Sequence, residues 1–193
     1  FSYDPKFNEE ARFSPDEFIS DVNFAIELED NSFIEYFDPS EINGDIEYFN
    51  DSNVNATLEY MGNGFYNLSI MNIGVKIIKK VWFPYENTEN VLNADTSDDI
   101  IYYPFEYGVA FLADSIYGKG WIPDKEVYYP GDCCSSPFVI IADDFKGKIV
   151  AATNWPPKKV QPRYNDNKMV LIYNEDINLL DQKNYISLIK IVD

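Results

Sequence analysis

The sequence predicts an all-β protein whose strands form an antiparallel β-sandwich, with one or two short helices near the N-terminus. Apolar and polar residues alternate over many short segments, turn signals recur roughly every 8–12 residues, and helical periodicity is not sustained over about ten residues anywhere. The chain has 193 residues, of which 46% are apolar, and this is enough for one domain with a substantial core. We predict a single domain over residues 1–193, with an N-terminal segment over 1–21 and the sandwich over 22–193.

One short helix is predicted over residues 14–20. Its first residues, Ser14-Pro15-Asp16-Glu17, combine an N-cap serine, a proline at the first helical position and two acids in the first turn. A weaker signal of the same kind, Asp38-Pro39-Ser40, predicts a second helical turn.

Strands account for the rest of the predicted fold. In residues 22–28 every second residue is apolar and falls on one face, and the same alternation recurs in 54–60 and 66–70. The glycines of Gly62-Asn63-Gly64 tolerate positive φ, so this segment predicts a hairpin turn between the last two runs. Further strands are predicted over 46–49, 75–83, 100–103, 107–112, 138–142, 148–152, 169–173 and 184–192.

Charge and composition exclude several classes of function. The chain carries 33 acidic and 15 basic residues, a formal net charge of −18, and no histidine. A surface this negative repels phosphate backbones, so we expect no nucleic-acid partner. Without histidine there is no Ser–His or Cys–His pair and no histidine general base. The longest apolar runs, 109–113 and 138–142, are far shorter than the ~20 residues of a membrane span, so we expect no membrane partner.

The start of the chain bears on its location. The sequence begins at Phe1 without a charged-then-apolar leader, which fits either the processed N-terminus of a secreted protein or the boundary of a cloned fragment. We expect a secreted, extracellular protein. Three N-glycosylation sequons, at Asn50, Asn55 and Asn67, are compatible with this location, although chance supplies sequons in an asparagine-rich chain.

The two cysteines, Cys133 and Cys134, are adjacent. Neighbouring Cα atoms lie 3.8 Å apart, which is below the usual disulfide range, so a bond between the two would be strained. Three states remain open: two thiols, a vicinal disulfide and an intermolecular bridge.

Carboxylates in one long loop suit calcium. Asp95, Asp98 and Asp99 lie in the segment 84–99, and their hard oxygen atoms are ligands that Ca²⁺ prefers. In the alternative, these acids cap turns and solvate the loop. We expect no other cofactor.

Aromatic residues make up 17% of the chain, and planar rings stack on sugars. Trp82, Trp121 and Trp155 are the candidate ligand-binding residues, the last two in the long connections 114–125 and 154–167. In the alternative these rings belong to the core, since aromatic residues commonly build sandwich cores.

A series of motifs follows a fixed order along residues 70–192. Asn72-Ile73-Gly74 precedes Val81-Trp82-Phe83-Pro84, and the segments 98–108, 129–131 and 138–152 come after them. In this order they resemble the N-terminal β-supersandwich (galactose-mutarotase-like) domain that precedes the (β/α)₈ barrel of several glycoside hydrolase families. The chain departs from that pattern at Lys146, where a glycine is common, and at Cys133-Cys134, which have no counterpart.

The resemblance implies a domain that packs against a catalytic barrel and lines a substrate rim. In such families the acid and the nucleophile lie on the barrel, so no catalytic residue is transferred to this chain. Mutarotases themselves use histidines on the sandwich, which this chain lacks. We therefore expect no catalysis by this chain alone.

Two functions follow from these observations. The first is a non-catalytic carbohydrate-associated domain of an extracellular glycoside-hydrolase-like protein, with a carbohydrate or an adjacent catalytic barrel as partner. The alternative is a secreted structural subunit of a surface layer, filament or capsid, in which residues 1–13 add to a neighbour's sheet edge and the protein self-assembles. An independent glycosidase would need two carboxylates at a defined separation, and among 33 acids no pair stands out.

Overall fold

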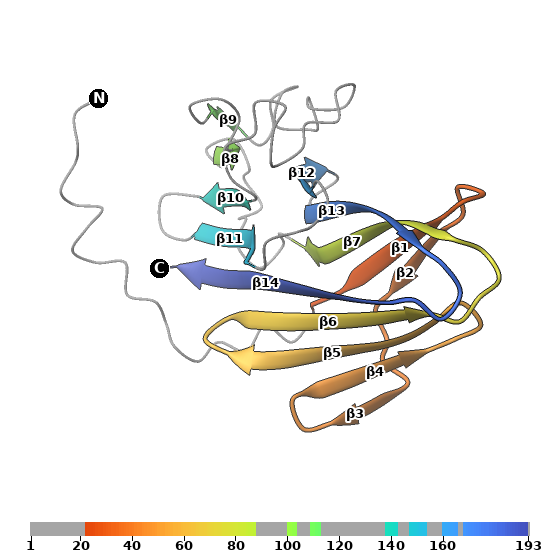
Figure 1. Cartoon of the computed structure of the whole chain (residues 1–193). Coiled ribbons are helices and arrows are strands. Elements are labelled where there is room, and N and C mark those ends of the chain that lie inside the picture. The colour runs from red at the N-terminus through yellow and green to blue at the C-terminus, as the bar shows by residue number, and fades with distance from the viewer. Residues whose placement is uncertain are drawn as a thin grey trace, which may run out of the picture.

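The computed structural model describes residues 22–87, 100–103, 109–112, 138–142, 147–153, 160–165 and 168–192. The regular structure of these residues consists of strands, with no helix (Figure 1). The helix expected over 14–20 lies outside the described residues. The strands are β1 (Phe24–Leu28), β2 (Phe33–Tyr36), β3 (Glu41–Asn43), β4 (Ile46–Asn50), β5 (Val54–Gly62), β6 (Phe65–Asn72), β7 (Ile78–Asn87), β8 (Ile100–Tyr103), β9 (Val109–Leu112), β10 (Phe138–Ala142), β11 (Gly147–Ala152), β12 (Val160–Asn165), β13 (Lys168–Ile177) and β14 (Gln182–Val192).

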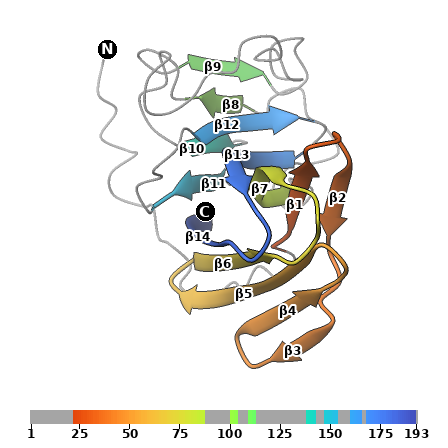
Figure 2. The ribbon, with the colours of Figure 1, turned by 45° about the vertical axis from the view of Figure 1, so that its right-hand side comes forward.

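The strands form two sheets that face each other (Figures 1 and 2). The smaller sheet has the order β12-β13-β7-β1-β2, and the larger has the order β3-β4-β5-β6-β14-β11-β10-β8-β9. The registers show antiparallel pairing between neighbouring strands in both sheets. The predicted antiparallel β-sandwich is therefore confirmed.

Aromatic and aliphatic side chains from both sheets fill the space between them. In β1 the apolar residues expected to share one face do point inward, with Phe24 and Ile26 fully buried. The Phe24 ring stacks on Tyr36 at a centroid distance of 4.6 Å and meets the edge of Phe49, from the opposite sheet, at 5.1 Å. Burying one side chain of this size stabilises the fold by about 1.5–3 kcal/mol.

The hairpin between β5 and β6 forms at the predicted glycines. Gly62, Asn63 and Gly64 all have positive φ, at 88°, 55° and 81°. A Cβ atom on Gly64 would lie 2.6 Å from the carbonyl oxygen of Ile189, so both the turn and the close approach of β14 require glycine there.

The helical turn expected at Asp38-Pro39-Ser40 is wrong. These residues form a bend between β2 and β3. The Ser40 backbone N–H and its hydroxyl both donate to the carbonyl oxygen of Tyr48, at 2.7 and 2.8 Å. Ser40 is thus bonded to β4 and does not cap a helix.

Strands β13 and β14 lie in different sheets and are joined by the short turn 178–181. In β13 the consecutive residues Met169 to Tyr173 are all buried, so both faces of this strand are covered. The inner face of the strand continues to Glu175 and Ile177, which are also buried.

Candidate functional site

Four aromatic side chains gather on the outer face of the five-stranded sheet, over β1, β2 and β7. We call Phe33, Phe37, Trp82 and Tyr85 the aromatic patch. Phe33 is 42% exposed and Phe37 43% exposed, while Trp82 and Tyr85 are partly buried. Exposure this large is unusual for phenylalanine, and clustered exposed rings commonly mark a binding surface.

A register shift in β7 brings Trp82 and Tyr85 together. Two residues that are three positions apart point to opposite faces of a regular strand. Here Tyr85 pairs with Val170 of β13 and Trp82 pairs with Ile172, and the register shifts between the two pairs. The intervening Phe83 is buried, and the Phe83–Pro84 peptide bond is cis. Both Trp82 and Tyr85 therefore lie on the outer face.

The rings of the aromatic patch support one another. The Phe33 and Trp82 rings meet edge to face at 5.2 Å with an interplanar angle of 82°, and Phe33 lies 5.9 Å from Tyr85. Trp82 and Tyr85 are 6.2 Å apart at 89°. Phe37 lies 6.4 Å from Tyr85. Such edge-to-face contacts are favourable and fix the rings in place before any ligand arrives.

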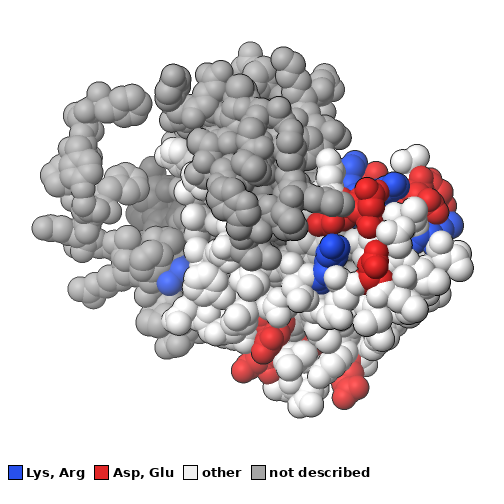
Figure 3. Space-filling model, viewed as in Figure 1, with Lys and Arg blue, Asp and Glu red and all other residues white. Residues whose placement is uncertain are grey.

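Polar groups stand beside these rings. The Tyr85 hydroxyl donates to the carboxylate of Glu35 at 2.8 Å, and the Glu35 side chain is exposed. On the same face the Lys80 ammonium group donates to both carboxylate oxygens of Glu27, at 3.1 and 3.2 Å. Lys80–Glu27 is one of three ion pairs among the described residues, with Lys76–Asp30 and Lys79–Asp176. Figure 3 shows acidic and basic side chains close together on the right of that view. The indole N–H of Trp82 is buried and has no hydrogen-bond partner in the described structure.

This arrangement is suited to binding. Exposed rings can contact apolar C–H groups, and an exposed carboxylate can accept hydrogen bonds from hydroxyl groups. Of the predicted ligand-binding residues, Trp82 lies in the aromatic patch, whereas Trp121 and Trp155 lie outside the described residues.

The predicted calcium ligands Asp95, Asp98 and Asp99 lie outside the described residues, as do Cys133 and Cys134. Where the structure is described, no group of three or more Asp, Glu, Cys or His side chains is placed to hold a metal ion. None of the described segments forms a helix that is long and apolar enough to cross a membrane.

The three sequon asparagines lie on strands of the nine-stranded sheet. Asn50 of β4 and Asn55 of β5 are exposed and stand directly opposite each other, while Asn67 of β6 is partly buried. The Asn50 amide donates to the Ser40 hydroxyl at 3.1 Å.

The sequence pattern does not identify three members of the aromatic patch, Phe33, Phe37 and Tyr85, or the neighbouring Glu35. The segment Phe33–Tyr36 carries one usable signal, since its alternation places Phe33 and Glu35 on one face. The contact of Phe33 with Trp82 depends on the position of β1 between β2 and β7, which no local pattern encodes.

No protein-family model matches the sequence, and a search of curated proteins found no match.

Proposed function

We propose that this chain is a non-catalytic carbohydrate-associated β-sandwich domain of an extracellular glycoside-hydrolase-like protein, and that it binds glycan on the aromatic patch. The observation that carries the proposal is the pairing of exposed rings with the Glu35 carboxylate on one sheet face. Sugar rings offer an apolar C–H face and a polar hydroxyl edge, and the patch presents a partner for each.

The charge of the patch narrows the class of glycan. Glu35 is an exposed acceptor, and the whole chain has a formal net charge of −18. Acidic sugars are repelled by such a surface. The ligand class that fits is a neutral oligosaccharide whose hydroxyl groups donate to Glu35.

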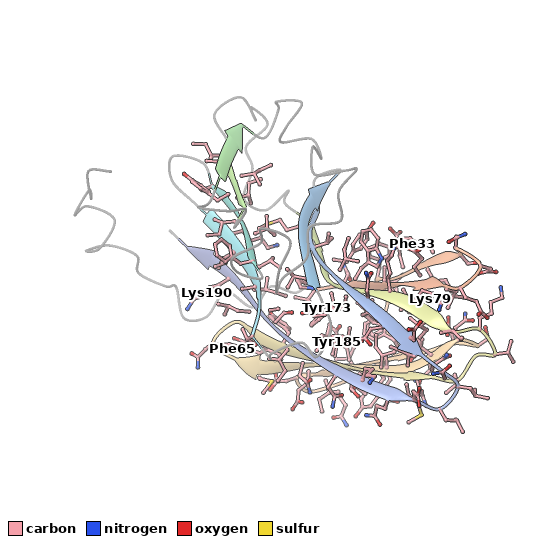
Figure 4. All side chains as sticks on the ribbon, turned by 45° about the horizontal axis from the view of Figure 1, so that its top comes forward. Phe33, Phe65, Lys79, Tyr173, Tyr185 and Lys190 are labelled. Carbon is pink, nitrogen blue, oxygen red and sulfur yellow. The ribbon has the colours of Figure 1, made fainter. Side chains whose placement is uncertain are left out.

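A glycan array followed by calorimetric titration of the full chain with a neutral oligosaccharide tests the proposal. Phe33→Ala should weaken binding about tenfold, which corresponds to about 1.4 kcal/mol. Phe65→Ala is the matched control, because Phe65 is also an exposed phenylalanine but lies on the other sheet (Figure 4). Trp121→Ala and Trp155→Ala examine the loop tryptophans in the same assay.

If no glycan on the array binds the protein, the proposed binding role is contradicted. If Phe33→Ala and Phe65→Ala weaken oligosaccharide binding equally, the aromatic patch is not the binding surface. Circular dichroism of each variant shows whether the fold is intact.

Open sheet edges support the alternative, a secreted structural subunit. Strand β3 ends the nine-stranded sheet, all three of its residues are exposed, and Ile42 at its centre is 64% exposed. An exposed edge strand can pair with a strand from another chain. Sedimentation velocity over a wide concentration range tests this alternative, because a protein that is monomeric at every concentration does not self-assemble.

A further inference from the structure

A polar cluster lies inside the sandwich, between β13 and β14. Tyr173, Tyr185 and Ser187, which we call the hydroxyl cluster, are each at most 3% exposed. Tyr173 belongs to the five-stranded sheet, and Tyr185 and Ser187 belong to the nine-stranded sheet. Figure 4 shows the two tyrosines between the sheets. The surrounding core is built mainly from aliphatic and phenylalanine side chains.

The three hydroxyl groups have unmet hydrogen-bonding capacity. The phenol oxygens of Tyr173 and Tyr185 and the Ser187 Oγ are shielded from solvent, and within the described structure none makes a hydrogen bond of regular geometry, although Ser187 lies beside the Tyr173 phenol and Glu175 beside the Tyr185 phenol. Buried polar groups in native proteins are nearly always paired, with protein atoms or with ordered water. Three hydroxyls in one core without a regular hydrogen bond therefore require an explanation.

The three groups are also close to one another. The Tyr173 and Tyr185 rings lie 4.7 Å apart, at an interplanar angle of 50°. Burial raises the pKa of the Tyr173 phenol, and the neighbouring Ser187 hydroxyl acts on that pKa in the opposite direction. Burial raises the pKa of the Tyr185 phenol as well, and both the charge of Glu175 and the close approach of its carboxylate to the phenol raise that pKa further. The hydroxyl cluster is thus one compact polar region beside Glu175.

We propose that Tyr173, Tyr185 and Ser187 form an internal binding site for ordered water, which links β13 to β14 across the sandwich. Each hydroxyl offers one donor and two acceptor positions, and a water molecule offers two of each. Buried waters typically make about three hydrogen bonds to otherwise unpaired groups, which matches the three hydroxyls.

The ligand chemistry favours water over a metal ion. The hydroxyl cluster supplies neutral oxygens, with Glu175 as the neighbouring carboxylate. No set of three acidic, cysteine or histidine side chains suited to a metal is found among the described residues. Water is neutral and both donates and accepts hydrogen bonds, so it matches this set of hydroxyl donors and acceptors.

Substitutions that remove one hydroxyl each provide the first test. In a dry core, Tyr185→Phe relieves an unpaired buried group, so the thermal midpoint should rise. In a hydrated site the same variant removes a hydrogen bond to water, so the midpoint should fall by a few degrees. The thermal midpoint of the double variant Tyr185→Phe with Ser187→Ala should fall by about as much as that of the more destabilised single variant, because both hydroxyls bind the same water.

Tyr48→Phe, on the outer face of β4, is the control for removal of a phenol hydroxyl. A rise in midpoint for Tyr185→Phe, or additive changes in the double variant, overturns the proposal. A midpoint that depends on whether the buffer holds Na⁺, K⁺ or choline overturns water as the ligand.

Direct detection of the water is the second test, and it holds even where a variant fails to fold. NMR cross-relaxation should show a long-lived water near the amide protons of Tyr173, Tyr185 and Ser187 in the unmodified chain. The exposed amide of Asn55 should show only fast-exchanging water. If the buried amides and the exposed amide of Asn55 show cross-relaxation with water of the same lifetime, the proposal is contradicted.

Discussion

The side-chain amide of Asn72 donates a hydrogen bond of 2.8 Å to the carbonyl oxygen of Ile177, which lies 105 residues further along the chain. The same amide donates to the carbonyl oxygen of Lys76 at 2.9 Å, and its oxygen accepts from the Gly74 N–H at 3.0 Å. Asn72 is buried, and these bonds connect the segment after β6 to the end of β13. One side chain thus holds two turns of the sandwich together.

Asn72→Asp should destabilise the protein strongly. The carboxylate keeps the size of the amide but cannot donate, and it places negative charge against two carbonyl oxygens. We expect a loss of about 3 kcal/mol in the free energy of unfolding, measured by urea denaturation. Asn55→Asp, at an exposed position, should change it by less than about 0.5 kcal/mol. Similar losses in the two variants would contradict the role assigned to Asn72.

Leu180→Gly should stabilise the protein. Leu180 adopts a φ of 67° in the turn between β13 and β14, a conformation that L-residues with large side chains rarely adopt, and its side chain is 69% exposed. Relief of this strain should raise the free energy of unfolding by about 1 kcal/mol. Leu179→Gly is the matched control, because Leu179 is exposed but has no positive φ. Stabilisation by both substitutions would disprove strain as the cause.

Gly64→Ala should be more damaging than Gly62→Ala. Both glycines have positive φ, so both alanines are strained by about 1 kcal/mol. An added Cβ at Gly64 would lie 2.6 Å from the Ile189 carbonyl oxygen, whereas one at Gly62 has nothing within 4 Å. We expect Gly64→Ala to cost a further 1–3 kcal/mol, roughly the usual range for overpacking. Equal midpoints in thermal denaturation would contradict the close approach of β14.

Asp51 should make stability depend on pH. Burial acts to raise its pKa, but the N–H groups of Val54 and Asn53 and the Tyr36 hydroxyl hold the pKa below the usual value of 3.8. A carboxyl whose pKa is lowered by folding contributes stability above its unfolded pKa, and the contribution is lost as pH falls through the folded value.

The Asp51→Asn variant isolates this contribution. It should be less stable than the unmodified chain at pH 7, and the difference should shrink as pH falls below about 4. Urea denaturation at several pH values measures it. A difference that stays constant from pH 7 to pH 2 would show that the charge of Asp51 contributes nothing.

Much of the fold can be predicted from alternation alone. The inward faces of β1, β5 and β6 follow from the period of two, because a strand with one buried face must alternate. Strands β2 and β3 are only 4 and 3 residues long and flank Pro39, so they carry too little pattern to identify. The residues Asp38-Pro39-Ser40 resemble a helix N-terminus. In the fold, however, the Ser40 hydroxyl donates a hydrogen bond to the Tyr48 carbonyl oxygen and does not cap a helix.

The candidate site is harder to predict from sequence. Trp82 is identified by its residue type, but Phe33 joins it only because β1 lies between β2 and β7. Tyr85 joins it through the register shift against β13. Pro84 is a local signal for an irregularity in β7, but the face on which Tyr85 then lies depends on the partner strand. Surfaces assembled from distant strands are decided by sheet order, and sheet order is a property of the whole chain.

The burial of β13 on both faces has a consequence for the dynamics of the protein. Amides in such a strand cannot exchange with solvent through local fraying, because exposing them requires breaking the pairing of β13 with β12 and β7 inside the buried part of the sandwich. The amide protons of Leu171, Ile172 and Tyr173 should therefore exchange among the slowest, with an opening free energy equal to that of global unfolding. The exposed ends of the sandwich, such as β3, should open far more readily. Strand β13 is thus the part of the chain whose hydrogen exchange reports the stability of the whole sandwich.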